Sequence, residues 1–207
     1  MTRSKKRPRI PIHWLHTQGY CEYQIQLEHV QKVISRLTPE MQLGAKRHLE
    51  LEEDHKQKAE LELTPEDALT KVKEERVTLD CRELPVQGSK IYGLIDEVHM
   101  SPSQVTIIDD KPNRRPYLST KKQIWGYCLA FEEHFNPKLP IVACLRHRDT
   151  QDIIWKKEFT IKDKEIVQTA IDRITGIINQ SREAIPTTNP KKCMKCRFQP
   201  ACDVKNV

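Results

Sequence analysis

The sequence of 207 residues predicts an α/β fold, in which helices cover the faces of a β-sheet. Two observations lead to this fold class. Between about residues 75 and 110, β-type residues alternate with polar ones, as they do in strands. After that stretch, segments with apolar residues at helical spacing alternate with short apolar runs. Strands interleaved with helices in this way are expected to form separate layers.

Composition suits a soluble globular protein, with 37% hydrophobic and 31% charged residues. No apolar run approaches the roughly 18 residues of a membrane span. The basic start, residues 1–9, is followed by too short an apolar stretch for a signal peptide. We therefore expect a cytoplasmic protein without a membrane partner. The net charge of +6 is compatible with a nucleic-acid partner but does not require one.

The first third of the chain is predicted to be helical. Residues 14–37 place apolar side chains at helical spacing in their second half, and Cys21 lies just before it. Residues 38–40, Thr-Pro-Glu, resemble a helix start, so a long charged helix is expected from there to about residue 62. Residues 63–67 are predicted to be a break with a second helix cap.

The remaining two thirds are predicted to hold the sheet and its covering helices. Proline-rich residues 111–116 should end the third strand, because proline cannot donate to a strand ladder. Ser119 or Thr120 is a candidate cap for the helix that follows. The expected strands are 76–79, 90–99, 104–109, 139–145 and 152–159, and the expected helices are 119–135 and 163–182.

The hairpin formed by the second and third strands carries the first candidate site. A turn centred between residues 102 and 103 places opposite each other residues whose numbers add up to 205, as those of Asp96 and Asp109 do. Their Cβ atoms would then lie about 5 Å apart on one face. Because side chains alternate along a strand, Lys111 shares that face and Asp110 points away.

Two carboxylates beside a lysine suit the cleavage of a phosphodiester. Oxygen ligands hold Mg²⁺ or Mn²⁺, which polarises the phosphoryl group and activates a water molecule, and a lysine stabilises the developing charge. The same residues also occur in ordinary charged hairpins, so the pattern alone leaves both interpretations open.

Three cysteines near the C-terminus, Cys193, Cys196 and Cys202, have the spacing C-x₂-C-x₅-C. In a chain whose thiols stay reduced, such a cluster indicates a metal site. Most iron–sulphur clusters and Cys₄ zinc sites need a fourth thiolate, and the spacing does not separate the two metals.

The fourth thiolate has four candidates. Three of them lie in expected strands or on an apolar helix face, where a buried thiol is the usual role. Only Cys21 is free of such a role, and with it a metal would join the two ends of the chain in one small lobe. The candidates are Cys21, Cys81, Cys128 and Cys144.

Short motifs follow one another along the chain in a distinctive order. They are Cys21, Gly44-x-x-x-His48, Gly93-x-Ile95-Asp96, Asp109-x-Lys111, Gln123-x-x-x-Tyr127, and the triplet Cys193, Cys196 and Cys202. This order resembles RecB-type nucleases of the PD-(D/E)xK superfamily, and most closely the CRISPR-associated Cas-four nucleases, which carry a [4Fe-4S] cluster. The superfamily more often has Glu at the position of Asp109 and Pro at that of Ile95.

The resemblance implies a restriction-endonuclease-like fold, a mixed β-sheet flanked by helices, with a small iron–sulphur lobe. The expected parts are a basic disordered tail (1–12), a RecB-like nuclease domain with a helical N-terminal part (13–185), and a C-terminal cysteine segment (186–207) that completes the lobe with Cys21.

The resemblance also assigns roles to residues. His48, Asp96, Asp109 and the backbone carbonyl of Asp110 would bind Mg²⁺ or Mn²⁺, and Lys111 would be the catalytic lysine. Gln123 and Tyr127 would contact DNA or orient the site, and Cys21, Cys193, Cys196 and Cys202 would hold the [4Fe-4S] cluster.

The implied activity is metal-dependent cleavage of single-stranded DNA, usually by an exonuclease, in the prokaryotic cytoplasm. The partners would be DNA and the CRISPR integrase proteins, in spacer acquisition for antiviral defence. Alternatives are a repair exonuclease of the exonuclease V type, a non-catalytic DNA-end-binding subunit, and a zinc-binding adaptor. Cleavage polarity, endonuclease action and oligomeric state stay open. Candidate DNA contacts are Arg114, Arg115, Tyr117, Lys121, Lys122 and Trp125.

Overall fold

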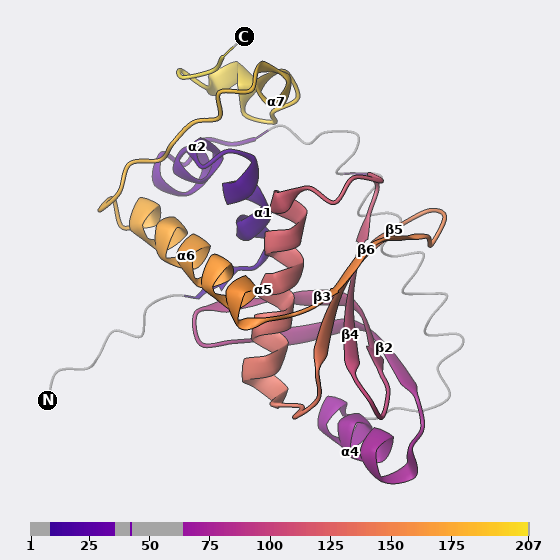
Figure 1. The fold of residues 1–207 in the computed structure, drawn as a ribbon. Helices are drawn as coiled ribbons and strands as arrows, with labels where there is room; N and C mark the ends of the chain where they lie inside the picture. The colour runs from indigo at the N-terminus through magenta and orange to yellow at the C-terminus, as the bar shows by residue number, and fades with distance from the viewer. Residues whose placement is uncertain (1–8, 36–41, 43–63, 207) are drawn as a thin grey trace, which may run out of the picture.

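A computed structural model describes residues 9–35, 42 and 64–206. A mixed β-sheet with helices packed against it forms the body of the molecule (Figure 1), as the fold class predicted. His48, most of the expected basic tail and most of the expected charged helix lie outside the described residues. Within the described residues, no helix is long and apolar enough to cross a membrane.

In the described part of the chain, six strands form the sheet, with both parallel and antiparallel pairs. Strand β4 pairs in parallel with β5, and β1 in parallel with β3, whereas β3 is antiparallel to β2 and β4, and β6 to β5. The strands are β1 (Ile10–Pro11), β2 (Leu79–Gln87), β3 (Ile91–Met100), β4 (Val105–Lys111), β5 (Ile141–His147) and β6 (Ile153–Glu158).

Strand β3 has one partner along its first edge and two along its second. On the first edge, β2 pairs with β3 from Tyr92 to Met100. On the second edge, β1 pairs at Ile91 and Tyr92, and β4 pairs only from Glu97 onward. Among the described strands, residues 93–96 therefore have no ladder partner on this edge. We call this opening between β1 and β4 the fork.

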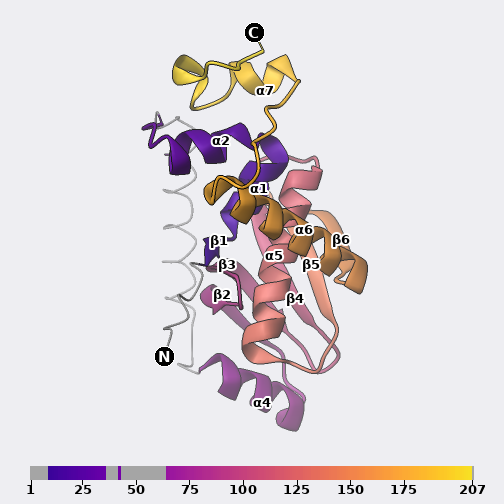
Figure 2. The same cartoon turned by 90° about the vertical axis from the view of Figure 1, so that its left-hand side faces the viewer.

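The two longest described helices, α5 and α6, form one layer beside the sheet together with α1. Helix α5 contacts β2, β3, β4 and β5, and α1 and α6 pack against it (Figures 1 and 2). Ile124, Cys128 and Phe131 of α5 are fully buried at helical spacing. The helices are α1 (His13–Tyr20), α2 (Tyr23–Ile25), continued by the π-helix η1 (Gln26–Val30), α4 (Pro65–Glu75), α5 (Leu118–Phe135), α6 (Ile161–Ile178), α7 (Pro190–Met194) and the 3₁₀ turn η2 (Gln199–Ala201).

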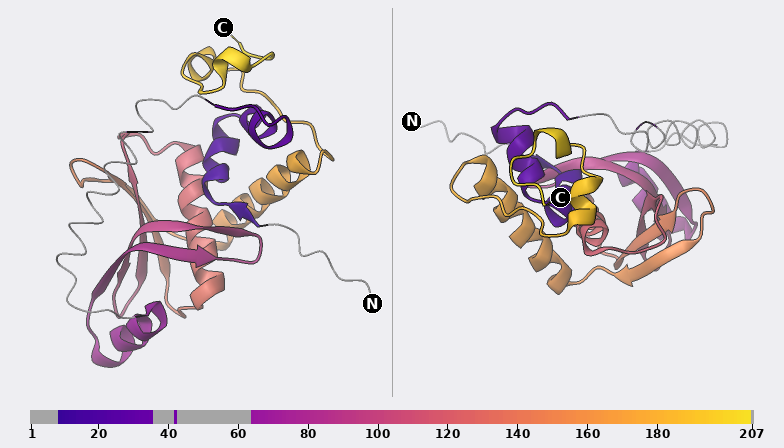
Figure 3. Two further views of the ribbon diagram at one scale, coloured as in Figure 1. Left: turned by 180° about the vertical axis from the view of Figure 1, so that it is seen from behind. Right: turned by 90° about the horizontal axis from the view of Figure 1, so that it is seen from above.

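The two ends of the described chain meet above α1. Segment 186–206, with α7 and η2, lies against α2 and η1 (Figure 3). Tyr23, Leu27 and Phe198 form a second small hydrophobic core there, separate from the main one. This terminal lobe, as we call residues 21–33 and 184–206, packs onto the helical layer.

Several predicted boundaries need correction. The first helix ends at Val30 rather than near residue 37, and Lys32 beyond it has a left-handed backbone (φ 59°). The strand expected at 76–79 begins only at Leu79, because α4 runs to Glu75 and Arg76 ends it with φ 56°. The predicted cap at residues 63–67 is confirmed, since the side chain of Thr64 accepts from the Asp67 amide.

The two long helices begin differently from the prediction. Neither predicted residue is the N-cap of α5, because the helix starts at Leu118, after Tyr117 as N-cap. Helix α6 begins at Ile161, since Thr160 and Asp163 form a capping box. The strands expected at 139–145 and 152–159 are confirmed as β5 and β6.

Candidate active site and cysteine cluster

The β3–β4 hairpin has the predicted register. Its ladder pairs run from Glu97 with Ile108 to Met100 with Val105, and the numbers of each pair add up to 205. If this register is continued by one residue past the pair of Glu97 and Ile108, Asp96 and Asp109 lie opposite each other where the fork opens. Both side chains are buried, so the two acids lie at a protected point where the strands separate.

A chain of polar contacts leads from Asp109 to helix α5. Lys111 Nζ lies 2.8 Å from Asp109 Oδ2 and donates to Gln123 Oε1 at 3.0 Å. Gln123 Nε2 in turn donates to the Tyr127 hydroxyl at 3.4 Å. Asp109 and Lys111 therefore share a face, as alternation predicted, and Gln123 and Tyr127 share the α5 face that meets them.

Burial and neighbouring charges shift the pKa values of Asp109 and Tyr127. Burial raises the pKa of Asp109 to about 7; Lys111 opposes this shift, and Asp96 adds to it. Burial and the two aspartates also raise the pKa of Tyr127, so its hydroxyl keeps its proton at neutral pH. An acid whose pKa lies near neutrality gives up its proton readily to a metal ion.

Gly93 of the Gly-x-Ile-Asp motif leaves room for the Tyr127 ring to pack against β3. A Cβ atom at this position would lie 2.9 Å from Tyr127 Cε1 and 3.1 Å from Ile12 Cδ1. Residues with a side chain would therefore push the ring or the start of α1 away from β3. The glycine is needed for close approach rather than for an unusual backbone conformation.

Asp110 points away from Asp109, as predicted, and contacts the site through its backbone. Its amide donates to Asp96 Oδ2 at 2.8 Å. On the other side of β4, its carboxylate pairs with Arg146, which also binds Glu97. Sequence reasoning missed Arg146 and Glu97, although a buried acid directed away from the site implies a cationic partner.

Glu83 of β2 is another acid near the site that the sequence did not indicate. It has a left-handed backbone (φ 50°) between Arg82 and Leu84, which pair with Glu97 and Ile95 of β3. This register places it beside Asp96, and its charge contributes to the raised pKa of Tyr127.

The expected DNA contacts divide into exposed and packed residues. Tyr117 is 51% exposed on the segment between Lys111 and α5, and Arg115 is exposed beside it. Trp125, in contrast, is buried. The other three have partners: Arg114 pairs with Asp152, Lys121 lies over the Trp155 ring, and Lys122 donates to Gln18.

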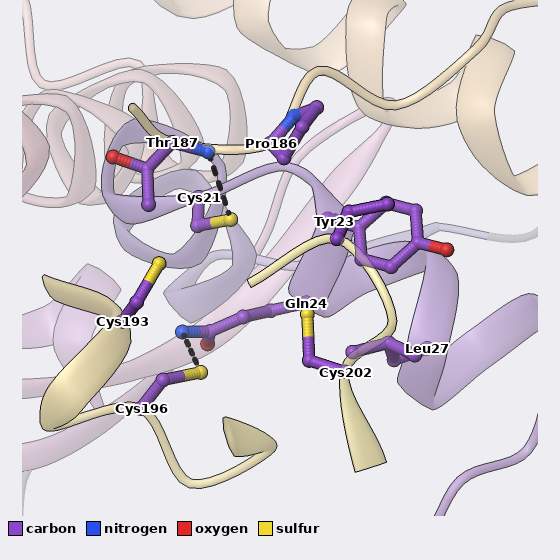
Figure 4. Close-up of a pocket in the computed structure, with 10 residues that line it drawn as sticks. Cys21, Tyr23, Gln24, Leu27, Pro186, Thr187, Cys193, Cys196 and Cys202 are labelled. Atoms are coloured by element: carbon purple, nitrogen blue, oxygen red, sulfur yellow. Dashed lines mark hydrogen bonds between the residues drawn. The ribbon is translucent and has the colours of Figure 1, made fainter. Parts of the chain in front are cut away.

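The four predicted cysteine ligands line one pocket of the terminal lobe (Figure 4). Cys21 comes from the N-terminal segment, and Cys193, Cys196 and Cys202 come from the C-terminal one. Two of the sulphurs accept hydrogen bonds: Gln24 Nε2 donates to Cys196 Sγ at 3.2 Å, and the Thr187 amide donates to Cys21 Sγ at 3.4 Å. Such donors suit thiolates more than thiols.

The donor set therefore fits a four-thiolate cofactor. Burial raises the pKa values of Cys196 and Cys202, so these thiols lose their protons only when a metal replaces them. Among the described residues, no group of three potential ligands is drawn together around a metal position, so the fit rests on the identity of the four cysteines and on their place in one pocket. The remaining cysteines, Cys81, Cys128 and Cys144, lie in β2, α5 and β5, as the sequence indicated.

Glu22, next to Cys21, ties the terminal lobe to the helical layer. Arg173 of α6 donates to both of its oxygens at 2.7–3.0 Å. Gln18 of α1 donates to the same carboxylate at 2.9 Å, and so does the backbone amide of Ile185. These hydrogen bonds outweigh the effect of burial and lower the pKa of Glu22, which stays ionised.

Comparisons with known proteins agree with this geometry. Residues 16–203 match the family described as the PD-(D/E)XK nuclease superfamily. A curated relative, the CRISPR-associated exonuclease Cas4/endonuclease Cas1 fusion of Myxococcus xanthus, is 24% identical over 206 residues. The match covers 94% of this chain but only 31% of the relative, so the chain spans about a third of that protein's length.

Two solved structures cover the whole of this chain, and the first of them shares its fold. A protein from Eubacterium rectale, named as a candidate exonuclease, has a TM-score of 0.50 and 12% identity, covering 100% of this chain and 95% of its own. The structure of SSO0001 has a TM-score of 0.49 and 18% identity, covering 100% and 91%. The family match covers nearly the whole chain, and it includes both the fork residues and the four cysteines. The chain therefore belongs to the PD-(D/E)XK nuclease superfamily, and it is similar to the Cas4 nucleases within it.

Proposed function

We propose that this nuclease is a divalent-metal-dependent deoxyribonuclease that degrades single-stranded DNA from an end. The observation that supports it most is the contact chain from Asp109 through Lys111 and Gln123 to Tyr127, with Asp96 beside it at the fork. Acids, a lysine and hydrogen-bond donors converge there from two strands and one helix, as phosphodiester hydrolysis requires.

In this proposal Asp96, Asp109 and the Asp110 carbonyl hold Mg²⁺ or Mn²⁺, together with His48, which lies outside the described residues. The metal, when bound, would polarise the phosphoryl group and lower the pKa of a water molecule. Lys111 then orients the attacking water and stabilises the charge that develops on the phosphate. Gln123 holds Lys111 in place, and Tyr127 holds Gln123.

Preference for a single strand is supported by the segment between Lys111 and α5. Proteins that bind single strands combine basic groups with aromatic side chains on which bases stack. Tyr117 and Arg115 offer both to a strand that approaches the fork, and both are exposed. We infer that this segment is the strand-binding surface nearest to the metal site.

We also propose that the cysteine pocket holds a [4Fe-4S] cluster. Its four thiolates come from both ends of the chain, and two of them already accept N–H donors. A zinc ion is the alternative cofactor. The two differ in colour, because an iron–sulphur protein purified anaerobically is brown and a zinc protein is colourless.

For a cellular role we propose CRISPR spacer acquisition, with an integrase as partner. The support is the Myxococcus relative, whose name joins an exonuclease Cas4 to an endonuclease Cas1 in one chain. A repair exonuclease would use the same site with other partners, so cleavage alone does not separate the two roles. Addition of a CRISPR integrase does, because only the adaptation role predicts a change in the products.

The deciding experiment is cleavage of end-labelled single- and double-stranded DNA with Mn²⁺, Mg²⁺ or EDTA. The wild type is compared with Asp109→Ala and with Asp172→Ala, which removes an exposed acid from α6. We expect metal-dependent loss of the single strand that disappears only in Asp109→Ala. Equal cutting by wild type and Asp109→Ala would refute the site. A folded, metal-loaded wild type that binds DNA ends without cutting would favour the non-catalytic subunit.

A further inference from the structure

A largely buried network of four charged side chains lies on the side of β4 that faces away from the site. Arg146 of β5 donates to Asp110 Oδ1 through Nε at 2.7 Å and to Asp110 Oδ2 through Nη2 at 2.9 Å. The same guanidinium donates to both oxygens of Glu97, at 3.2 and 2.9 Å. Arg82 of β2 pairs with Glu97 as well, and it approaches Asp110 at 3.6 Å.

This network spans the fork. Arg146 is the ladder neighbour of Asp110 in the parallel β4–β5 pair. Glu97 and Ile108 form the last ladder pair between β3 and β4, so Arg146 reaches across β4 to the residue at which β3 diverges. It therefore fixes three strands relative to one another where the metal-binding residues begin.

The backbone of Asp110 faces the site while its side chain is held in the network. Its amide donates to Asp96 Oδ2 at 2.8 Å, and its carbonyl is the expected metal ligand. On the N-terminal side of Glu97, β3 is not joined to β4 by ladder pairs. The backbone ladder between these strands therefore does not set the position of Asp110 relative to Asp96. The fork-shaped guanidinium of Arg146 supplies a fixed geometry there, because it binds two carboxylates at once.

Charge balance argues against a role in attracting metal or DNA. Two arginines and two acids sum to zero, and the Asp110 side chain is fully buried while that of Arg146 is 13% exposed. A buried ion pair is seldom more stabilising than apolar residues of the same volume, so it is poor evidence for a purely stabilising role. What distinguishes the Arg146 network is the fixed geometry in which it holds Asp110 and Glu97.

We propose that Arg146 is a positioning residue of the metal site, which acts by holding Asp110 so that the amide of Asp110 orients the Asp96 carboxylate. The inference rests on the proposed metal-dependent function, and it assigns no contact between Arg146 and metal or substrate. Partners of metal ligands typically affect metal affinity 10–100-fold. Arg146 should therefore affect how tightly metal binds more than how the bound metal performs chemistry.

The test compares Arg146→Lys and Arg146→Met with Arg173→Lys. The control alters an equally well-formed bidentate pair, that of Arg173 with Glu22, which joins α6 to the terminal lobe. Direct Mn²⁺ binding is measured by calorimetry without DNA, and the Mn²⁺ concentration for half-maximal cleavage is measured separately. We expect about tenfold weaker Mn²⁺ binding in Arg146→Lys, cleavage that recovers to within severalfold of wild type at saturating Mn²⁺, and wild-type Mn²⁺ binding in Arg173→Lys.

Several outcomes would overturn the inference. Folded Arg146 variants with wild-type Mn²⁺ affinity would show that the network only stabilises the fold. If both Arg146 variants fail to fold, Asp110→Asn decides, because it keeps the side-chain shape and the amide but weakens the pair; wild-type Mn²⁺ affinity in that variant also refutes the inference. A wild type that neither binds Mn²⁺ nor cleaves DNA would refute the proposed function itself, which is a separate result.

Discussion

The raised pKa of Asp109 makes the metal-free protein less stable at alkaline pH than it would be without this acid. In the folded protein the pKa is about 7, against a usual value of 3.8. Between these values the folded state binds more protons than the unfolded state, so the free energy of unfolding falls as pH rises. Substitution by Asn removes this penalty, since Asn cannot ionise.

The size of the effect follows from the pKa difference. From pH 5 to the folded pKa of about 7 is roughly two units, and each unit is worth about 1.4 kcal/mol. We therefore expect wild type to lose roughly 3 kcal/mol relative to Asp109→Asn between pH 5 and pH 8.5. The comparison cancels other titrating groups, among them His16, whose pKa burial lowers to about 4.

Urea unfolding in EDTA at pH 5, 6, 7 and 8.5 measures this difference. The difference in the free energy of unfolding between the two proteins should increase up to about pH 7 and then remain constant. At high pH, Mn²⁺ should reduce this difference, because it binds the ionised wild type. Asp152→Asn is the control, because Asp152 is an exposed acid with a lowered pKa. A gap that is independent of pH would show that Asp109 is ionised in the metal-free fold and would refute the reasoning.

Two further predictions concern the Tyr127 ring and the strand-binding segment. Gly93→Ala should displace Tyr127 and reduce cleavage by about tenfold or more with little change in DNA binding. The control is Gly88→Ala, whose Cβ would lie 2.5 Å from the flexible end of Glu133 and at ordinary contact distance, 3.4 Å, from Ala130 Cα. Equal cleavage rates in wild type and Gly93→Ala would contradict the role of the ring. Tyr117→Ala should weaken single-strand binding measured in EDTA by roughly 5- to 150-fold, because stacking contributes about 1–3 kcal/mol per base. The exposed Tyr92→Ala serves as its control, and an unchanged affinity would remove Tyr117 from the binding surface.

Local patterns in the sequence predicted the half of the site that depends on local geometry. The hairpin register and the opposite directions of Asp109 and Asp110 follow from a turn and from strand alternation, which sequence numbers encode directly. The contacts that complete the site come from distant segments. Arg146 lies 36 residues from Asp110, and only the parallel pairing of β4 with β5 brings the two together.

Boundaries were missed where helices begin or end without the residues that usually cap them. Arg76 and Lys32 adopt left-handed backbones without being glycine or asparagine, so neither position signals the end of a helix. Helix α5 begins after Tyr117, whose side chain makes no capping hydrogen bond. Propensity rules favour Ser or Thr at that position, and the packing of α5 against α1 and the sheet overrides them.

The meeting of the two chain ends in the terminal lobe has a consequence for biosynthesis. Cys21 precedes strands β2 to β6 in the chain, but the three cysteines that line the pocket with it follow only after those strands and helices α5 and α6 have been translated. Closing a loop of that length costs conformational entropy that local contacts cannot offset, so the lobe should assemble last. Until then the pocket-lining side chain of Cys21 is open to oxidation and to other metals. Loading of the proposed cluster is therefore expected to follow translation of the whole domain rather than to guide its folding.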